Sequence, residues 1–358
     1  MTATIKEVAQ KAKVSTATVS RVMNNSDLVD EKTRKIVLQA ARELHYIPNA
    51  TGRSLSTHRT DAIGLLLPDL YGEFFSEVIR GSDLAAQKNK YHLLVSSSHN
   101  HREEIRAALQ MMRGIVDGLI IMSPHIDANT LDANLPKALP VVLLNCLVEG
   151  DTFDAFNIDN YSGAYQIVNH LLGHGHQCIA MIKGTQNNVD AEERLRGYRA
   201  AVREHTIDRR YSYEVEGDFS EESGYAAVTH ILECSPRPTA IFAGNDCMAI
   251  GAISALHDRG IRIPEEIAIA GFDDIPMAEY VNPPLSSVRV NISELGRLAV
   301  ERIVHAIKQK NTHEKDRIIV PTNVVARESC GCIGSAISVF SKKLVNQSNA
   351  QHFPQQKN

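Results

Sequence analysis

The chain has 358 residues, of which 43% are hydrophobic and 22% are charged, so it holds enough apolar material for two or three domains. No run of about 18 apolar residues is present, which excludes a transmembrane helix. The first residues lack the apolar stretch of a secretory signal, and the six cysteines form neither a disulfide framework nor a paired CxxC site. We therefore expect a cytoplasmic protein with reduced thiols and no membrane association.

The formal net charge of −4 is distributed unevenly along the chain. Residues 1–60 hold ten Lys and Arg against five acidic residues, whereas the remainder holds 28 against 37. A basic N-terminal segment on an acidic remainder is expected if only the first part meets a polyanion such as nucleic acid.

The first 46 residues have the spacing of three short helices. Apolar residues recur at helical intervals at the start, namely Ile5, Val8, Ala9 and Ala12. Ser15 can cap a second helix over residues 16–23. A third helix is predicted from about Glu31 to His45, with a buried stripe of Ile36, Val37, Ala40, Ala41 and Leu44. This spacing predicts an all-α helix-turn-helix domain over residues 1–46, whose second helix enters the major groove of DNA.

Three stretches of this head are more specific than a generic helix-turn-helix. They are the sequences IKEVA (residues 5–9), VSTATVSRV (residues 14–22) and ARELHYIPN (residues 41–49). Together they resemble the head of the lactose/galactose repressor (LacI/GalR) family of transcription regulators. The resemblance implies that this head binds operator DNA.

The resemblance also implies roles for single side chains of the head. Thr16, Ala17 and Arg21 would read base edges, and a guanidinium can bond bidentately to guanine. Hydroxyl and amide groups would contact phosphates and fix the register, namely those of Ser15, Thr18, Ser20, Asn24, Thr33 and Tyr46. A local cap or turn bond is the alternative for each Ser and Thr.

Residues 47–59 form a polar linker that is too short to be a stable isolated helix. The resemblance implies a hinge segment that folds only on operator DNA and inserts Leu55 into the minor groove, where an apolar wedge kinks the duplex. The alternative is that Leu55 packs against the body. Gly52 costs roughly 1 kcal/mol of helix propensity, so we expect weaker hinge folding here.

From residue 60 to residue 330, short β-branched runs alternate with helical stretches, which predicts an α/β body with parallel sheets. Two nearly equal lobes are expected. The first comprises about residues 61–160 and 292–316, and the second comprises about residues 161–290 and 317–330. This two-lobed plan is that of the periplasmic-binding-protein-like core, which the resemblance implies.

Ligands of open α/β sheets bind beyond the carboxyl ends of the strands, here between the lobes. The candidate effector-binding residues are Asp69, Phe74, Phe75, Asn145, Arg194, Phe219, Asn245 and Asp273. Arg194 stands in ERLRGY (residues 193–198), which matches a family segment whose first Arg reaches the effector.

Paired hydroxyls of a sugar suit this set, because each hydroxyl can donate to a carboxylate and accept from an Arg or Asn. Phe74 or Phe75 would stack on the apolar face of a sugar. Asp246 and Asp274 are set aside as a helix cap and a turn residue, respectively.

Other combinations of residues indicate no chemistry. His170 and His174 are one helical turn apart without a following acid, and Cys330 and Cys332 are two thiols alone. We therefore expect no metal, and no cofactor beyond the effector. No catalytic set is found, so an enzyme is not expected.

These observations predict a sequence-specific DNA-binding transcription regulator, a repressor whose affinity for a pseudo-palindromic operator is controlled by a sugar. A purine or nucleoside effector is one alternative, and a body that acts as a solute receptor is another. The tail, residues 331–358, lacks leucine heptads and is rich in Ser, Gln and Asn. We therefore expect a homodimer and a disordered tail.

Overall fold

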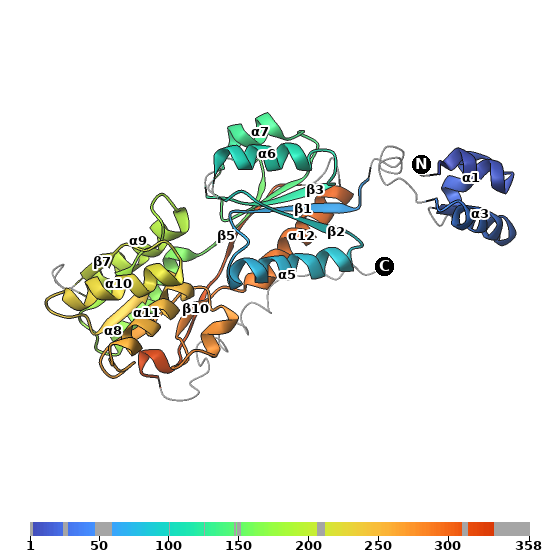
Figure 1. Ribbon diagram of the computed structural model, residues 1–358. Helices are drawn as coiled ribbons and strands as arrows, with labels where there is room; N and C mark the ends of the chain where they lie inside the picture. The colour runs from blue at the N-terminus through green and yellow to red at the C-terminus, as the bar shows by residue number, and fades with distance from the viewer. Residues whose placement is uncertain are drawn as a thin grey trace, which may run out of the picture. The chain divides into compact units, whose positions relative to one another are not determined.

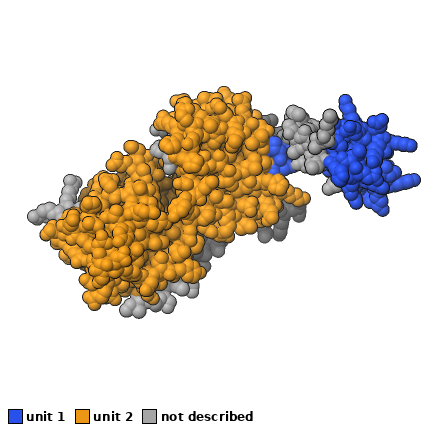
Figure 2. All heavy atoms as spheres, viewed as in Figure 1, with its two compact units in different colours: residues 1–61 blue, residues 62–358 orange. Residues whose placement is uncertain are grey.

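A computed structural model of the chain describes residues 3–23, 28–46, 59–99, 101–124, 126–146, 148, 152–205, 212–309 and 314–332. The chain divides into two compact units, residues 1–61 and 62–358, which are coloured separately in Figure 2. The predicted roles of Asn24 and Leu55, the hinge residues 47–58 and the tail beyond residue 332 lie outside the described residues.

The first unit contains the three predicted helices, α1 (Ile5–Ala12), α2 (Thr16–Met23) and α3 (Glu31–Glu43). Its core consists of small aliphatic residues only, namely Val8, Ala9, Ala12, Val19, Val22, Val37, Ala40 and Ala41. The prediction that Ile36 belongs to the buried stripe is wrong, because this side chain is 45% exposed. Small side chains let the three short helices approach closely, so the core is filled without the Ile36 side chain.

Side-chain caps define where these helices begin. Thr4 and Glu7 form a reciprocal capping box at α1. The Ser15 hydroxyl accepts a hydrogen bond from the Thr18 amide at 3.1 Å, which confirms the predicted cap of α2. Asp30 accepts from the Thr33 amide at 2.9 Å at the start of α3.

The first lobe of the second unit is built on a six-stranded parallel sheet (Figure 1). Its order is β11 (Arg317–Val320), β5 (Asp154–Ile158), β4 (Val141–Leu144), β3 (Gly118–Met122), β1 (Ala62–Leu67), β2 (His92–Ser97). The helices α5 (Glu73–Lys88) and α12 (Ile292–Lys308) cover one face, and α6 (Arg102–Met112) and α7 (Ala128–Asn134) cover the other.

The pair α5 and α12 packs closely because of one glycine in particular. A Cβ on Gly81 would lie 1.8 Å from the carbonyl oxygen of Ser293 on α12. The two backbones therefore approach more closely than any side chain at this position would allow.

The second lobe contains a four-stranded parallel sheet in the order β7 (Ser212–Val215), β6 (Ile179–Ile182), β8 (Ala240–Ala243), β9 (Ala268–Ala270). α8 (Asn160–Gly173) packs against α9 (Val189–Glu204), and α10 (Glu221–Glu233) packs against α11 (Asp246–Asp258). A short antiparallel pair joins β10 (Ser287–Arg289) to β12 (Asn323–Val325). Among the described residues, short 3-10 helices lie before β10, as η2 (Pro276–Glu279), and after β12, as η3 (Glu328–Cys330).

The predicted boundary of the second lobe at residue 317 is wrong. β11 pairs in parallel with β5, from Arg317 opposite Ala155 to Val320 opposite Ile158, so it belongs to the sheet of the first lobe. Only β12 and the segment after it return to the second lobe. The chain therefore crosses between the lobes after β5, after β10 and after β11.

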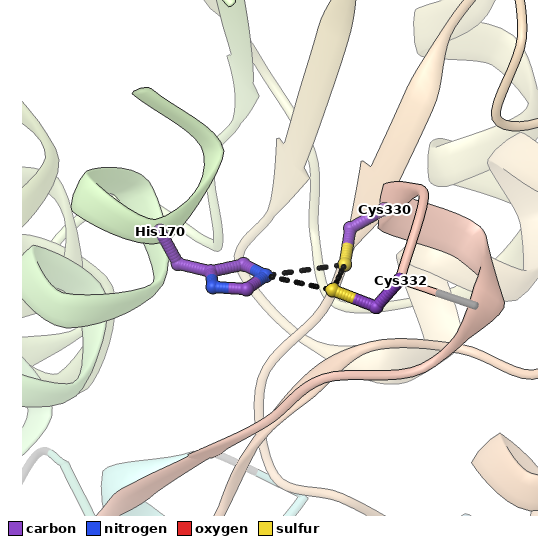
Figure 3. A group of neighbouring side chains, drawn as sticks. All are labelled: His170, Cys330 and Cys332. Carbon is purple, nitrogen blue, oxygen red and sulfur yellow. Dashed lines mark hydrogen bonds between the residues drawn. The ribbon is translucent and has the colours of Figure 1, made fainter. Parts of the chain in front are cut away.

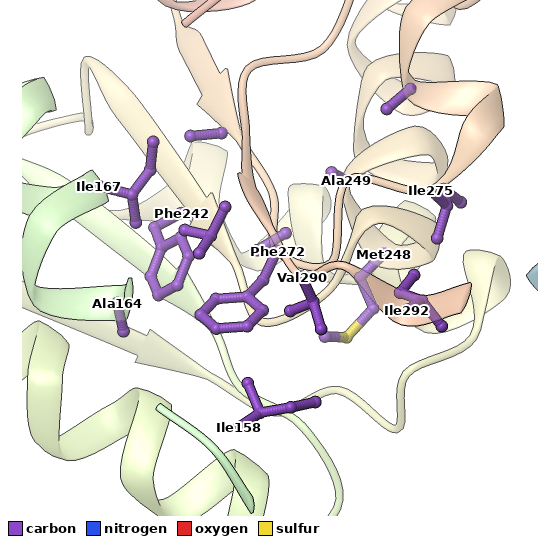
Figure 4. Close-up of a cluster of buried hydrophobic side chains, with 14 of the residues drawn as sticks. Ile158, Ala164, Ile167, Phe242, Met248, Ala249, Phe272, Ile275, Val290 and Ile292 are labelled. Atoms are coloured by element: carbon purple, nitrogen blue, oxygen red, sulfur yellow. The ribbon is translucent and has the colours of Figure 1, made fainter. Parts of the chain in front are cut away.

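An apolar cluster lies where two of these crossings meet the second lobe (Figure 4). Phe242 and Phe272 belong to one cluster with Ile158, at the end of β5, and Val290, just after β10. All four side chains are buried, so the floor of the second lobe is closely packed beneath the polar residues described next. Among the described residues, no helix is long and apolar enough to span a membrane.

Candidate functional site

One exposed surface of the head carries the three predicted base-reading residues. Thr16, Ala17 and Arg21 are all exposed on α2. Ala17 and Arg21 are four residues apart and so share one side of the helix, and Thr16 is its first residue. Within the described part of the chain, Arg21 forms no ion pair, so its guanidinium is available to an external acceptor.

The predicted phosphate-binding residues differ in their burial and in their local hydrogen bonds. The hydroxyls of Ser15 and Thr18 lie 2.9 Å apart in the cap of α2, so the alternative of a local bond is present in the structure. Thr33 is half-buried at the start of α3, and the half-buried Tyr46 packs against the core of the head. Ser20 is half-buried on α2. Phosphate contact by these residues stays a prediction.

A cleft of about 320 Å³ opens beyond the carboxyl ends of the strands in the second unit. It lies at the point where the strand order reverses in both sheets, between β1 and β3 in one and between β6 and β8 in the other. The structure brings all eight predicted effector-binding residues into its lining, namely Asp69, Phe74, Phe75, Asn145, Arg194, Phe219, Asn245 and Asp273.

Arg194 is the centre of a buried hydrogen-bond network at the base of this cleft. Its side chain is held by α9 and is only 4% exposed. It donates to the Asn160 side chain at 2.8 Å, to the Gly244 carbonyl at 2.5 Å and to Asp273 at 3.0 Å. Its guanidinium carbon also lies 3.8 Å from the centre of the Phe272 ring. A guanidinium fixed from four sides is preorganised to meet a ligand oxygen.

Two carboxyls lie near this guanidinium, that of the buried Asp273 and that of the half-buried Asp190. Burial raises the pKa of Asp273 to about 6, although the Arg194 charge opposes the shift and the Asp190 charge adds to it. Burial likewise raises the pKa of Asp190, which accepts a hydrogen bond from Asn160 at 2.7 Å. Two carboxyls against one guanidinium leave spare acceptor capacity, which suits ligand hydroxyls.

Asp190 and Asn160 are members of the site that the sequence analysis missed. Asp190 lines the cleft, and Asn160 links it to Arg194. Asp190 stands just before the ERLRGY segment, which was the available signal, but an acidic residue in a first helical turn is unremarkable by itself.

Asn245, and not Asp246, caps α11. Asn245 is the N-cap of α11, where it accepts from the Met248 amide at 2.9 Å and donates to the Phe219 carbonyl at 3.0 Å. The prediction that Asp246 caps this helix is therefore wrong. Asp246 is fully buried and accepts from the Ile275 amide and the Ser287 hydroxyl. Asn245 still lines the cleft, with one lone pair and one N–H beyond these bonds.

Aromatic rings line the cleft from both lobes. Phe74 and Phe75 meet edge to face at the start of α5, with ring centres 5.5 Å apart. Phe219 approaches from the second lobe, and a Cβ on Gly184 would lie 2.1 Å from its ring, so only glycine leaves room there. Such rings offer apolar faces to a ligand held by the polar network.

Two hydrogen bonds connect the walls of the cleft across the lobes. Glu73 on α5 accepts from the Met277 amide of η2 at 2.7 Å, and Asn145 donates to Asp190 at 3.4 Å. Asn145 and Asp273 have φ values of 48° and 104°, a region that non-glycine residues seldom occupy. Strained residues of this kind concentrate in ligand sites, where the surrounding structure holds them in place.

Comparison with known proteins agrees with this geometry. Residues 4–49 match the bacterial regulatory proteins of the lacI family, and residues 168–330 match the periplasmic binding protein-like domain. The ribose operon repressor of Haemophilus influenzae is 36% identical over 328 residues, which cover 91% of this chain and 98% of that repressor. The transcriptional repressor PurR of Edwardsiella ictaluri is also 36% identical, over 91% of this chain and 96% of PurR.

Solved structures show the same architecture. The Lac repressor dimer bound to operator and an anti-inducer has a TM-score of 0.79 at 28% identity, over 92% of this chain and 99% of that chain. The regulator CelR in complex with cellobiose has a TM-score of 0.68 at 32% identity, over 91% and 99%. The head, the two-lobed body and the polar cleft between the lobes are the parts of an effector-controlled transcription regulator. The chain belongs to the lacI family of bacterial regulatory proteins.

Proposed function

We propose that the protein is a repressor that binds a pseudo-palindromic operator as a homodimer, and that a sugar bound in the cleft sets its operator affinity. The observation that carries the proposal is the polar set of Arg194, Asp190 and Asp273, which lines the same cleft as the aromatic wall of the first lobe. In this proposal the protein acts where the DNA is, in the cytoplasm, and catalyses no reaction.

The polar network supports a sugar for a geometric reason. A pair of adjacent hydroxyls can donate to Asp190 or Asp273 while accepting from Arg194, which satisfies both partners. The rings of Phe74 and Phe75 can cover the C–H face of a sugar ring. A structural relative from Enterococcus faecium, 28% identical with a TM-score of 0.67, contains bound ribose.

A purine or nucleoside is the second candidate effector. Phe219 on one lobe and Phe74 or Phe75 on the other could enclose a flat base. The carboxyls of Asp190 and Asp273 would then bond to ring N–H groups instead of hydroxyls. The two candidates differ in which cleft residue matters most, because stacking dominates for a base and the polar network dominates for a sugar.

The mechanism follows from a ligand that touches both lobes. A bound effector favours the arrangement in which Glu73 meets Met277 and Asn145 meets Asp190. Its differential affinity for the two arrangements of the lobes, about 1–3 kcal/mol in allosteric proteins, is the free energy that changes operator affinity. Operator binding must change effector affinity by the same factor.

The effector is tested with the intact chain and a panel of ribose, cellobiose and hypoxanthine. We expect one of the two sugars to raise the thermal unfolding midpoint and to bind with one site per chain by calorimetry. The proposal of a sugar is overturned if hypoxanthine alone binds, or if none of the three binds to a chain that is folded by circular dichroism.

DNA binding is tested separately by selection from randomised duplexes, followed by anisotropy titrations of the selected sequence over a series of salt concentrations. We expect a two-fold symmetric site and an affinity that falls as salt rises. A body that acts only as a solute receptor predicts no sequence-selective binding.

A further inference from the structure

A second group of polar side chains lies outside the effector cleft, where the segment after β12 returns to α8 (Figure 3). His170 and His174 lie one turn apart near the end of α8. Cys330 is the last residue of η3, and Cys332 follows after a single glycine. None of the four lines the cleft. Neither pair forms a site alone, which is why the sequence predicted no metal, but the fold brings the pairs together across 160 residues of chain.

Three of these side chains have the spacing of ligands of one metal ion, because the ligand atoms of His170, Cys330 and Cys332 all lie within 4.8 Å of one another. His174 approaches this group at Cys332. His170 Nε2 lies 3.2 Å from the sulfur of Cys330 and 3.7 Å from that of Cys332. The two sulfurs are 3.6 Å apart, and Cys332 Sγ is 3.4 Å from His174 Nε2. Tetrahedral zinc with bonds of about 2.3 Å to sulfur and about 2.0 Å to nitrogen separates its ligand atoms by roughly 3.3–3.8 Å.

The chemistry of the donors points to the same ion. Two thiolates and two imidazole nitrogens form the Cys₂His₂ set, which binds zinc in structural sites. Oxygen-binding cations such as magnesium and calcium are disfavoured because no carboxylate belongs to the group.

The surroundings also suit a metal site. The Ser286 hydroxyl donates a hydrogen bond to Cys330 Sγ at 3.0 Å, and outer contacts of this kind orient a ligand. Cys330 is buried, whereas His174 is exposed, so an ion can reach the group from solvent.

We propose that His170, His174, Cys330 and Cys332 form a Cys₂His₂ zinc site. The site fastens the segment after β12 to α8 and thereby holds the last described part of the chain on the second lobe. Because zinc binds the folded site and not the dispersed ligands, it stabilises the fold as its free concentration rises above its dissociation constant.

The test uses the full chain, reduced, stripped of metal by a chelator and titrated with Co²⁺ and then Zn²⁺. We expect one Co²⁺ per chain, with intense visible bands of a tetrahedral site and a thiolate charge-transfer band, all lost when Zn²⁺ displaces cobalt. The double variant Cys330→Ser/Cys332→Ser should lose the charge-transfer band, and His170→Ala should weaken Zn²⁺ binding at least tenfold.

A matched control is available on α10. The double variant His230→Ala/Cys234→Ser removes a histidine and a cysteine one turn apart that belong to no such group among the described residues. It should leave the cobalt spectrum and the zinc affinity unchanged.

Loss of the buried Cys330 could prevent folding, so two further measurements keep the proposal testable. The exposed His174 can be replaced by Ala, and this variant should fold but bind Zn²⁺ more weakly. The wild-type chain should also unfold at a lower temperature in chelator than in zinc. A cobalt spectrum without thiolate bands, unchanged spectra in the cysteine variant, or a Cys330–Cys332 disulfide whose reduction restores no zinc binding would each overturn the proposal.

Discussion

The head and the body hold their functional polar side chains in opposite ways. In the head, Thr16, Ala17 and Arg21 project from α2 into solvent, over a core of small aliphatic residues that do not involve them. In the body, Arg194 and Asp273 are buried and hydrogen-bonded to each other beneath the cleft.

In the head, the residues that recognise a ligand are therefore not the ones that stabilise the fold. In the body, the same residues do both. An exposed side chain without a protein partner can change without leaving anything unsatisfied. A buried charge that loses its partner leaves an uncompensated charge behind, which destabilises the fold strongly. Substitutions should therefore alter unfolding in the body and leave it unaltered in the head, although both alter function.

The largest effect is expected for Arg194→Ala. The change leaves Asp273, the Asn160 oxygen and the Gly244 carbonyl without the donor they share, so we expect the free energy of unfolding to fall by about 3–5 kcal/mol. Urea unfolding measures this loss, and calorimetry should show no effector binding. The matched control is Arg196→Ala, two residues along α9 but 63% exposed at its side chain, which should change stability by less than about 0.5 kcal/mol. Equal losses in the two variants would contradict the assigned role of the network.

A smaller effect, dependent on pH, is expected for Asp273→Asn. In the folded protein the pKa of Asp273 is about 6, against an ordinary value of 3.8. The folded state therefore binds this proton more tightly than the unfolded state does, so the contribution of Asp273 to stability is greatest at low pH. Its contribution falls as pH rises from about 4 through about 6, by about 3 kcal/mol at most. Urea unfolding from pH 4 to 7 should show that the variant lacks this decline. A variant with the pH dependence of the wild type would show that Asp273 does not titrate in this range.

The sequence predicted most of the cleft because its residues follow strands. Asp69 and Asn145 come directly after apolar strands, and the carboxyl ends of parallel strands meet at one edge of a sheet. Arg194 was found through the ERLRGY segment. These signals are local, so they can be recognised in the sequence without knowing which strands pair.

The features that were missed depend on contacts between distant parts of the chain. β11 lies at a sheet edge beside β5, more than 150 residues earlier, and no pattern within its four residues shows that register. Asp190 is distinguished from a surface carboxylate only by Asn160 and Arg194 around it. The two Cys and two His near α8 likewise become a group only through the fold.

A still smaller effect on stability is expected for Glu73→Ala, which removes a hydrogen bond between the lobes. The Met277 amide loses its acceptor, so we expect the unfolding free energy to fall by about 1 kcal/mol and effector affinity to fall severalfold, as the closed arrangement becomes less populated. Urea unfolding and calorimetry measure the two losses. Glu77→Ala is the matched control, since that residue on α5 pairs only with Arg80 of the same helix among the described residues. Similar effector affinities in both variants would mean that the bond plays no part in closure.

The smallest effect on stability, and a large one on recognition, is expected for Arg21→Ala. The exposed guanidinium supports no contact within the described head, so unfolding should change by less than about 0.5 kcal/mol. Specific operator binding should weaken by about 1–3 kcal/mol per site contact, measured by anisotropy against the selected duplex and a scrambled one. Arg21→Lys keeps the charge but not the two-pronged geometry, so it should retain nonspecific binding and still lose preference for the selected duplex. Effector binding should match the wild type in both variants, because the residues that line the cleft belong to the second unit. If Arg21→Ala lowered stability by as much as Arg194→Ala, the exposed positions of the head would be as strongly coupled to its fold as the cleft is to the body, and the contrast between the two units would fail.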